Sequence, residues 1–309
     1  MIYKEKSTLP YSLIDIHTHG SFGINFNIAN YDEIKFLLSE FYKKGIKGIC
    51  PTLVGDVDEK IYNQLKLFKQ IKKEQLENSN SEALILGVHL EGTFLSPKNS
   101  GIQNKQVFKK PSVGNFENLV KDCIDIIKIV TIAPEEDIDL ISYLNQKGII
   151  AQAGHTIGDD LKGCIGTTHH FNAMPRIHHR DSTITLQGLI NDDIYCEVIP
   201  DLIHSSFEML KLFFRVKPKD KILLISDSLP SSNFNQGVIF CEKKINAKGE
   251  DENGTLAGSN KTLDEIVENL VKKQILTEDD IIQMGFKNQI KYLKLTKDEI
   301  NILIREKIW

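Results

Sequence analysis

The sequence predicts an α/β fold, a (β/α)8 barrel of the TIM type, because strand-like and helix-like segments alternate along most of the chain. Eight short runs of apolar and β-branched residues are typical of strands, and continuous runs such as Ile222–Ile225 suit parallel strands buried on both faces. A chain of 309 residues, 41% of them hydrophobic, can fill a core of this size. The predicted strands are Leu13–His17, Gly48–Leu53, Leu84–Leu90, Ile126–Ile132, Ile149–Ala153, Gly166–Phe171, Tyr195–Ile199 and Ile222–Ser226.

Amphipathic periodicity predicts helices in the connections between these strands. The pattern is clearest at Tyr31–Lys44 and Asp58–Glu77, and Asp137–Gln146 also indicates a helix, with Gly148 placed to end it. One connection is short, since the segment between His155 and Thr168 leaves room for little more than one helical turn.

The alternation stops after the eighth strand. Val238–Asn246 and Gly254–Ala257 indicate a short hairpin or loop excursion. Three helices are expected after it, at Leu263–Lys273, Glu278–Met284 and Lys297–Lys307. No low-complexity linker interrupts the chain, so we expect a single barrel domain over residues 1–309 with a helical C-terminal extension from about residue 261.

Composition and charge exclude several classes of protein. A net charge of −4 argues against a nucleic-acid-binding surface or a polybasic membrane-binding surface. No apolar run approaches the ~18 residues that a membrane span needs, and Met1–Ser12 lacks the apolar core of a secretory signal. The five cysteines are scattered without a C-x-x-C pair, which favours buried reduced thiols in a cytoplasmic protein.

Ionisable residues fall at the ends of the predicted strands. The carboxyl ends of barrel strands form one ring, where catalytic residues of this fold lie. Residues two apart share a face of a strand, so an H-x-H pair at the first strand can point into that ring. The residues concerned are His17, His19, Glu91, His155, His169, His204 and Asp227, with Asp201 three residues before His204.

Each of these residues also has a purely structural interpretation. An H-x-H pair occurs by chance, Glu91 alone could be a loop carboxylate, and Asp227 alone could cap the helix after the eighth strand. Their joint position at different strand ends instead predicts a metal site, because imidazole and carboxylate ligands suit a divalent ion such as zinc or iron. An ion with an open position activates water and polarises a carbonyl, and a nearby carboxylate can move the proton, so the residues predict amide hydrolysis.

Eight segments of the chain, between about Asp15 and Leu270, carry a more specific signal. They are DIHTHG at Asp15–Gly20, HLEGTFLSP at His89–Pro97, KIVTIAPE at Lys128–Glu135, AGHT at Ala153–Thr156, THHFNAM at Thr168–Met174, DLIH at Asp201–His204, SDS at Ser226–Ser228 and DENGTLAGS at Asp251–Ser259. In type and order they resemble the motifs of the N-acetylglucosamine-6-phosphate deacetylase family of the amidohydrolase superfamily.

The resemblance implies a set of metal ligands. Glu91, His155 and His169 would hold the main ion, and the pair His17 and His19 implies a second position, so one or two ions of zinc or iron are expected per subunit. Some amidohydrolases bridge two ions with a carboxylated lysine, but Glu91 occupies that place here, which leaves Lys128 a structural role.

The resemblance also implies how the substrate is held and cleaved. Asp227 would be the general base and acid, and His204 would contact the sugar or the acetamide oxygen. Asn172, the backbone N–H of Ala173 and the charge of Arg180 would bind the sugar phosphate. Arg180 would act across a homodimer on the substrate of a neighbouring subunit. By itself, Arg180 would be interpreted as a solvated surface arginine in a basic run.

Three departures from the family pattern are evident. The flanking β-sandwich of the family is expected to be missing or reduced, Leu202 stands where glycine is usual, and the connection between His155 and His169 is shortened. The expected reaction is hydrolysis of N-acetylglucosamine 6-phosphate to glucosamine 6-phosphate and acetate. Two alternatives stay open: an amidohydrolase acting on another N-acyl sugar or a cyclic amide, and a catalytically inactive relative that binds a sugar phosphate.

Overall fold

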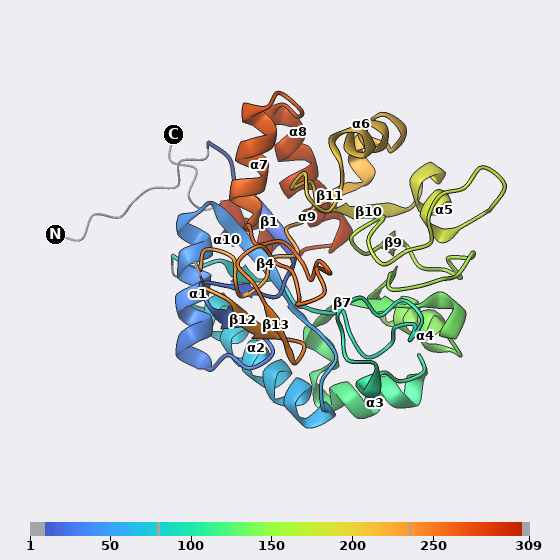
Figure 1. Ribbon diagram of the computed structural model, residues 1–309. Helices are drawn as coiled ribbons and strands as arrows, with labels where there is room; N and C mark the ends of the chain where they lie inside the picture. The colour runs from blue at the N-terminus through green and yellow to red at the C-terminus, as the bar shows by residue number, and fades with distance from the viewer. Residues whose placement is uncertain (1–9, 79–80, 235, 305–309) are drawn as a thin grey trace.

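The computed structural model describes residues 10–78, 81–234 and 236–304, and in them the predicted barrel is present (Figure 1). Successive strands are parallel neighbours in the order β1-β4-β6-β7-β8-β9-β10-β11. The third predicted strand is split, because β5 pairs only with β4 and the chain bends at Leu86 and Gly87 before β6. The strand bounds are β1 Leu13–Thr18, β4 Ile46–Leu53, β5 Leu84–Ile85, β6 Val88–Leu90, β7 Ile127–Ile132, β8 Ile150–Ala153, β9 Gly166–Thr167, β10 Tyr195–Val198 and β11 Ile222–Leu224.

The first and last strands meet just beyond the end of β11. Thr18 and Ser228 form a parallel bridge, and the His19 N–H donates to the Ser228 carbonyl at 2.8 Å. The Asp227 N–H donates to the carbonyl of His17 at 2.9 Å. This closure places the chain after β11 directly against the chain after β1, so the two histidines of the first strand lie beside Asp227.

Ten α-helices are assigned in the part of the chain that the structure describes, and they include those predicted from periodicity. The helix predicted from Asp137 begins only at Leu140, because the Asp137 carboxylate accepts the N–H groups of Leu140 and Ile141 at 3.1 and 3.2 Å. Gly148 ends this helix with φ 72°, as predicted. The helix bounds are α1 Tyr31–Lys43, α2 Asp58–Glu77, α3 Val113–Val120, α4 Leu140–Lys147, α5 Ile184–Ile190, α6 Phe207–Val216, α7 Leu263–Lys272, α8 Glu278–Ile282, α9 Asn288–Tyr292 and α10 Lys297–Ile304.

The segment predicted to be one helix at Glu278–Met284 is longer and irregular. α8 passes through a π-helical turn at Gln283–Lys287 into α9, a continuation that periodicity within a single short window did not reveal. The last three residues of the helix predicted at 297–307 lie outside the described residues. No helix forms between β8 and β9, as the short connection suggested. None of the helices in the described ranges is long and apolar enough to cross a membrane.

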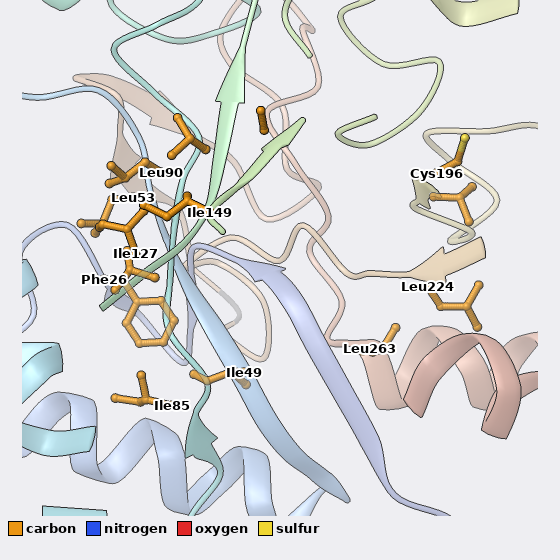
Figure 2. Packing of buried hydrophobic residues seen from close by; sticks show 14 of the residues in the cluster. Phe26, Ile49, Leu53, Ile85, Leu90, Ile127, Ile149, Cys196, Leu224 and Leu263 are labelled. Carbon is orange, nitrogen blue, oxygen red and sulfur yellow. The ribbon is translucent and has the colours of Figure 1, made fainter. Parts of the chain in front are cut away.

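Two apolar layers support the barrel. The larger one lies between strands and surrounding helices, and Figure 2 shows some of its members, such as Phe26 and Leu224. A second cluster joins strand residues such as Ile14 and Leu223 to Tyr292 of α9 and Leu303 of α10. The C-terminal helices therefore share a core with the barrel, which supports our proposal of a single domain.

Outside the barrel, the described strands form two small antiparallel pairs, β2 Gly20–Ser21 with β3 Ile24–Asn25 and β12 Val238–Phe240 with β13 Lys243–Ile245. The second pair is the predicted hairpin excursion. A small cluster holds it against the barrel loops, and this cluster is made of Val54, Ile102, Leu229, Phe240 and Ile245. That the flanking β-sandwich of the family is missing or reduced stays a prediction.

A pair of glycine substitutions tests the tight approach at the end of β6. A Cβ on Gly92 would lie 1.8 Å from the Gly55 nitrogen and 2.5 Å from the Val54 carbonyl carbon, both backbone atoms that cannot move aside cheaply. We expect Gly92→Ala to lower the free energy of unfolding by about 3 kcal/mol or more in urea denaturation. Gly114→Ala in α3 is the matched control, since nothing lies within 4 Å of its Cβ, and it should gain about 0.5–1 kcal/mol. Equal stabilities of the two variants would contradict the packing argument.

Candidate metal centre and substrate pocket

Glu91, directly after β6, lies at the centre of the predicted ligand set. Its Oε1 atom lies 2.8 Å from Nε2 of His169 and 3.0 Å from Nε2 of His155. The two histidine Nε2 atoms are themselves only 3.1 Å apart. Two imidazole lone pairs and a carboxylate oxygen at such distances fit the donor set of a divalent cation.

The pair from the first strand joins the same carboxylate from the other side. His19 Nε2 lies 3.4 Å from Glu91 Oε2, and His17 Nε2 lies 3.8 Å from Glu91 Oε1. Asp227 completes the group, with its Oδ1 atom 3.1 Å from Nε2 of His19 and 3.3 Å from Nε2 of His17. The structure therefore brings the predicted ligands and the predicted base together in one buried cluster, with Glu91 between two candidate metal positions.

Hydrogen bonds on the far side of the rings orient three of these histidines. Nδ1 of His19 lies 3.2 Å from the carbonyl of Thr52, and Nδ1 of His155 lies 3.1 Å from the carbonyl of Asn99. Nδ1 of His17 lies 3.0 Å from a carboxylate, Oε2 of Glu197. Because each of these oxygens accepts a hydrogen bond from Nδ1–H, Nε2 is the nitrogen that faces the cluster and can serve as the ligand atom.

The charges in the cluster stabilise one another. Burial would raise the pKa of Glu91, but His155 and His169 hold the pKa of that carboxyl well below its ordinary value. Burial alone would lower the pKa of His17, whereas the charges of Asp227 and Glu197 outweigh it and raise the pKa to about 10. Burial also opposes ionisation of Asp227, yet His17 and His19 lower its pKa. The histidines therefore favour the ionised form of both carboxylates, which is the form that can act as ligand or proton acceptor.

The backbone at the cluster occupies left-handed conformations that residues other than glycine rarely adopt. The φ angles are +46° at His155, +33° at His169 and +51° at Asp227. Left-handed conformations of this kind cost of order 1–3 kcal/mol each and concentrate at functional sites. The fold thus holds the ligand side chains at some expense of stability.

A cavity of about 410 Å³ opens above the cluster, a size typical of small-molecule sites. The predicted substrate residues Asn172, Ala173 and His204 all line it, together with Glu91 and Asp227. The hairpin and the following loop form one wall, through Phe240 and residues 254–258. Metal cluster and substrate residues therefore face a common space.

Among the predicted site residues, Arg180 is the one that this chain brings neither to the buried cluster nor to the cavity. It is exposed in the loop before α5, which lies at the periphery of the barrel (Figure 1). Its assignment stays a prediction. His178 and His179 are exposed in the same loop, and Lys128 contacts the Leu293 carbonyl at 3.4 Å, consistent with a structural role.

Three residues at the site had no role predicted for them, although Asp201 was already placed among the ionisable residues at the strand ends. Glu197 stands inside the apolar run Tyr195–Ile199, and a charged residue in a buried strand was the available signal. Asp201 accepts a hydrogen bond from His204 Nδ1 at 2.9 Å and another from Ser259 Oγ at 3.0 Å. Phe240 packs its ring 5.1 Å from that of His19, a contact across 221 positions that no local pattern indicates.

Comparisons with known proteins give a consistent result, although no family model matches the chain. N-acetylglucosamine-6-phosphate deacetylase of Bacillus subtilis (strain 168) is 32% identical over 300 residues, which cover 93% of this chain and 76% of that protein. N-acetylgalactosamine-6-phosphate deacetylase of Escherichia coli O157:H7 is 25% identical over 285 residues, or 88% and 74% of the two chains.

Among solved structures, N-acetylglucosamine-6-phosphate deacetylase from Thermotoga maritima superposes with a TM-score of 0.82 at 27% identity, covering 92% of this chain and 78% of that one. This likeness confirms the (β/α)8 barrel. With 32% identity to a relative over three quarters of its length, the chain belongs to the N-acetylglucosamine-6-phosphate deacetylase family.

Proposed function

We propose that the protein hydrolyses the acetamide of N-acetylglucosamine 6-phosphate to glucosamine 6-phosphate and acetate. The observation that carries the proposal is the position of Asp227, a buried carboxylate within 3.3 Å of two metal-type histidines, on the wall of a cavity that Asn172 and His204 also line. Family membership supports the substrate, since the relatives named above include deacetylases of this sugar phosphate.

We propose two divalent ions, zinc or iron, bound by Glu91 with His155 and His169 and by Glu91 with His17 and His19. When bound, such an ion polarises the acetamide carbonyl and lowers the pKa of coordinated water. The burial of all five side chains supports this assignment, because buried imidazoles and a carboxylate in contact are otherwise costly.

Asp227 then performs both proton transfers. Its carboxylate accepts the proton of the attacking water, and the same proton passes to the sugar nitrogen as the C–N bond breaks, which returns Asp227 to its starting state. The amine and acetate leave as separate products. This sequence needs no second acid.

His204 is placed to stabilise the oxyanion. Burial would lower its pKa, but the hydrogen bond and charge of Asp201 raise it. In its protonated form the imidazole would donate from Nδ1 to Asp201 and keep an N–H on Nε2, an atom that is buried without a hydrogen-bond partner among the described residues. We propose that this N–H donates to the acetamide oxygen.

For the phosphate we propose Asn172, the backbone N–H of Ala173, and Arg180 supplied by the second subunit of a homodimer. Arg180 is exposed and does not line the cavity of its own subunit, and both observations support a role in trans. A cytoplasmic location is also proposed, supported by the five free cysteines.

An acetate-release assay on the purified protein, with metal analysis of the same sample, tests these proposals. We expect kcat/KM for N-acetylglucosamine 6-phosphate to exceed that for unphosphorylated N-acetylglucosamine by at least about 100-fold. Without the phosphate, the protein groups proposed to bind it would be left unpaired. N-acetylgalactosamine 6-phosphate is the matched comparison for the sugar ring. Equal rates with and without the phosphate would favour an enzyme for another N-acyl sugar. Sugar-phosphate binding without turnover in zinc or iron would indicate the inactive relative.

A further inference from the structure

We infer that Glu197 of β10 is a positioning residue of the metal centre. It fixes the ring of His17, a ligand of the second ion, and links this ring to the backbone of His169, a ligand of the first ion. The inference rests on the proposed two-ion site. Glu197 belongs to none of the sequence motifs that indicated the active site.

Glu197 is fully buried, with 0% of its surface exposed. Its Oε2 atom lies 3.0 Å from Nδ1 of His17 and accepts the peptide N–H of His169 at 3.2 Å. Its own carbonyl accepts the N–H of His170 at 2.7 Å. One carboxylate oxygen therefore contacts the side chain of His17, from the second ligand set, and the backbone of His169, from the first.

The burial of this carboxylate calls for a functional explanation. Removing an ionised carboxylate from water costs several kcal/mol unless a partner compensates it. Within the described ranges, the ion pair that the structure gives Glu197 is with His17, and no lysine or arginine is paired with it. A buried carboxylate paired with the outer nitrogen of a candidate ligand is the arrangement that orients metal ligands and raises their basicity.

The His17–Glu197 contact decides which nitrogen of His17 can bind metal. Because Nδ1–H donates its hydrogen bond to Glu197, Nε2 is the nitrogen that would lose its proton and bind the ion, and this atom faces Asp227 and Glu91 at 3.3 and 3.8 Å. A carboxylate acceptor also makes the imidazole a stronger ligand than a carbonyl acceptor does. The other histidines of the cluster with an assigned Nδ1 contact use backbone carbonyls, so His17 is the ligand most dependent on its acceptor.

His89 supports the same ring without competing for the ion. Its ring packs edge-on against His17 at 4.6 Å, while its Nδ1 and Nε2 atoms contact the Ile16 carbonyl at 3.3 Å and Thr131 Oγ1 at 2.8 Å. His17, His89 and Glu197 lie close enough to suggest a further metal trio. Because both nitrogens of His89 already have hydrogen-bond partners, we infer that His89 and Glu197 hold His17 in place and do not bind a third ion.

The test compares metal affinity in the wild type and in Glu197→Gln, which keeps the side-chain volume and removes the charge. Competition with a chelator gives the dissociation constant of each ion, and elemental analysis gives the stoichiometry. We expect the second ion, held by Glu91, His17 and His19, to bind about 10–100-fold less tightly in the variant. Glu299→Gln is the matched control, since it removes another buried carboxylate, paired with Lys72 at 2.8 Å far from the cavity, and should leave both constants unchanged.

A double-mutant cycle shows whether Glu197 acts through His17. In a His17→Asn background, which should retain the ion at Glu91, His155 and His169, Glu197→Gln should have no further effect on the affinity for that remaining ion. An equal loss in both backgrounds would overturn the inference, as would wild-type affinity in Glu197→Gln or a wild-type protein that binds a single ion. If Glu197→Gln does not fold, Glu197→Asp, which withdraws the carboxylate by one methylene, gives the same comparison. Two-ion binding without any acetate release would instead refute the proposed function and leave this inference standing.

Discussion

Asp227→Asn is expected to lower kcat for acetate release by at least about 1,000-fold, the loss typical of a missing general acid–base group. The amide is the same size as the carboxylate but cannot accept the proton of the attacking water. The Oδ1 atom that would do so lies 3.1 and 3.3 Å from the Nε2 atoms of His19 and His17. The measurement is single-turnover acetate release at saturating N-acetylglucosamine 6-phosphate.

Two controls separate lost proton transfer from lost metal. Elemental analysis of Asp227→Asn should still find an ion at Glu91, His155 and His169, because none of these contacts involves Asp227. Asp264→Asn removes a partly buried carboxylate that pairs with Lys44 at 3.1 Å, remote from the cavity, and should retain wild-type kcat. Near wild-type acetate release from Asp227→Asn would show that Asp227 is not the base.

Periodicity and strand-end chemistry predicted the barrel and the composition of the metal cluster. The bounds of α2 are those expected, and the predicted ligands Glu91, His155 and His169 meet within about 3 Å of one another. Such features are predictable because a strand pattern is local, and because a closed parallel sheet brings all carboxyl ends to one mouth.

What could not be predicted depends on contacts between distant segments. Glu197 was interpreted as part of an apolar strand, and its contact with His17 arises only because barrel closure places β10 two strands from β1, with β11 between them. The break in the third strand depends on Gly87, whose φ of 151° removes a regular pairing that apolar content alone suggested. The position of Arg180 depends on an exposed loop, for which a single sequence carries little information.

Glu91→Gln is expected to abolish metal binding at both positions and to reduce acetate release by at least about 10,000-fold, as for loss of a catalytic metal ion. Its Oε1 atom contacts His155 and His169, and its Oε2 atom lies 3.4 Å from His19. An amide offers one weak ligand oxygen in place of two charged ones, and its NH2 group would face imidazole nitrogens that must remain free for metal. His17→Asn is the matched comparison, because His17 is assigned only to the second ligand set and the variant should leave one ion bound.

Thermal unfolding with and without a chelator distinguishes the loss of metal from the loss of structure. An ion that binds only the folded protein raises stability in proportion to RT ln(1 + [L]/Kd). The wild-type Tm should therefore fall on chelation, the Tm of His17→Asn should fall less, and the Tm of Glu91→Gln should not respond. A chelator-sensitive Tm in Glu91→Gln would mean that the histidines hold an ion without this carboxylate. In that case Glu91 could not be the residue that joins the two metal positions.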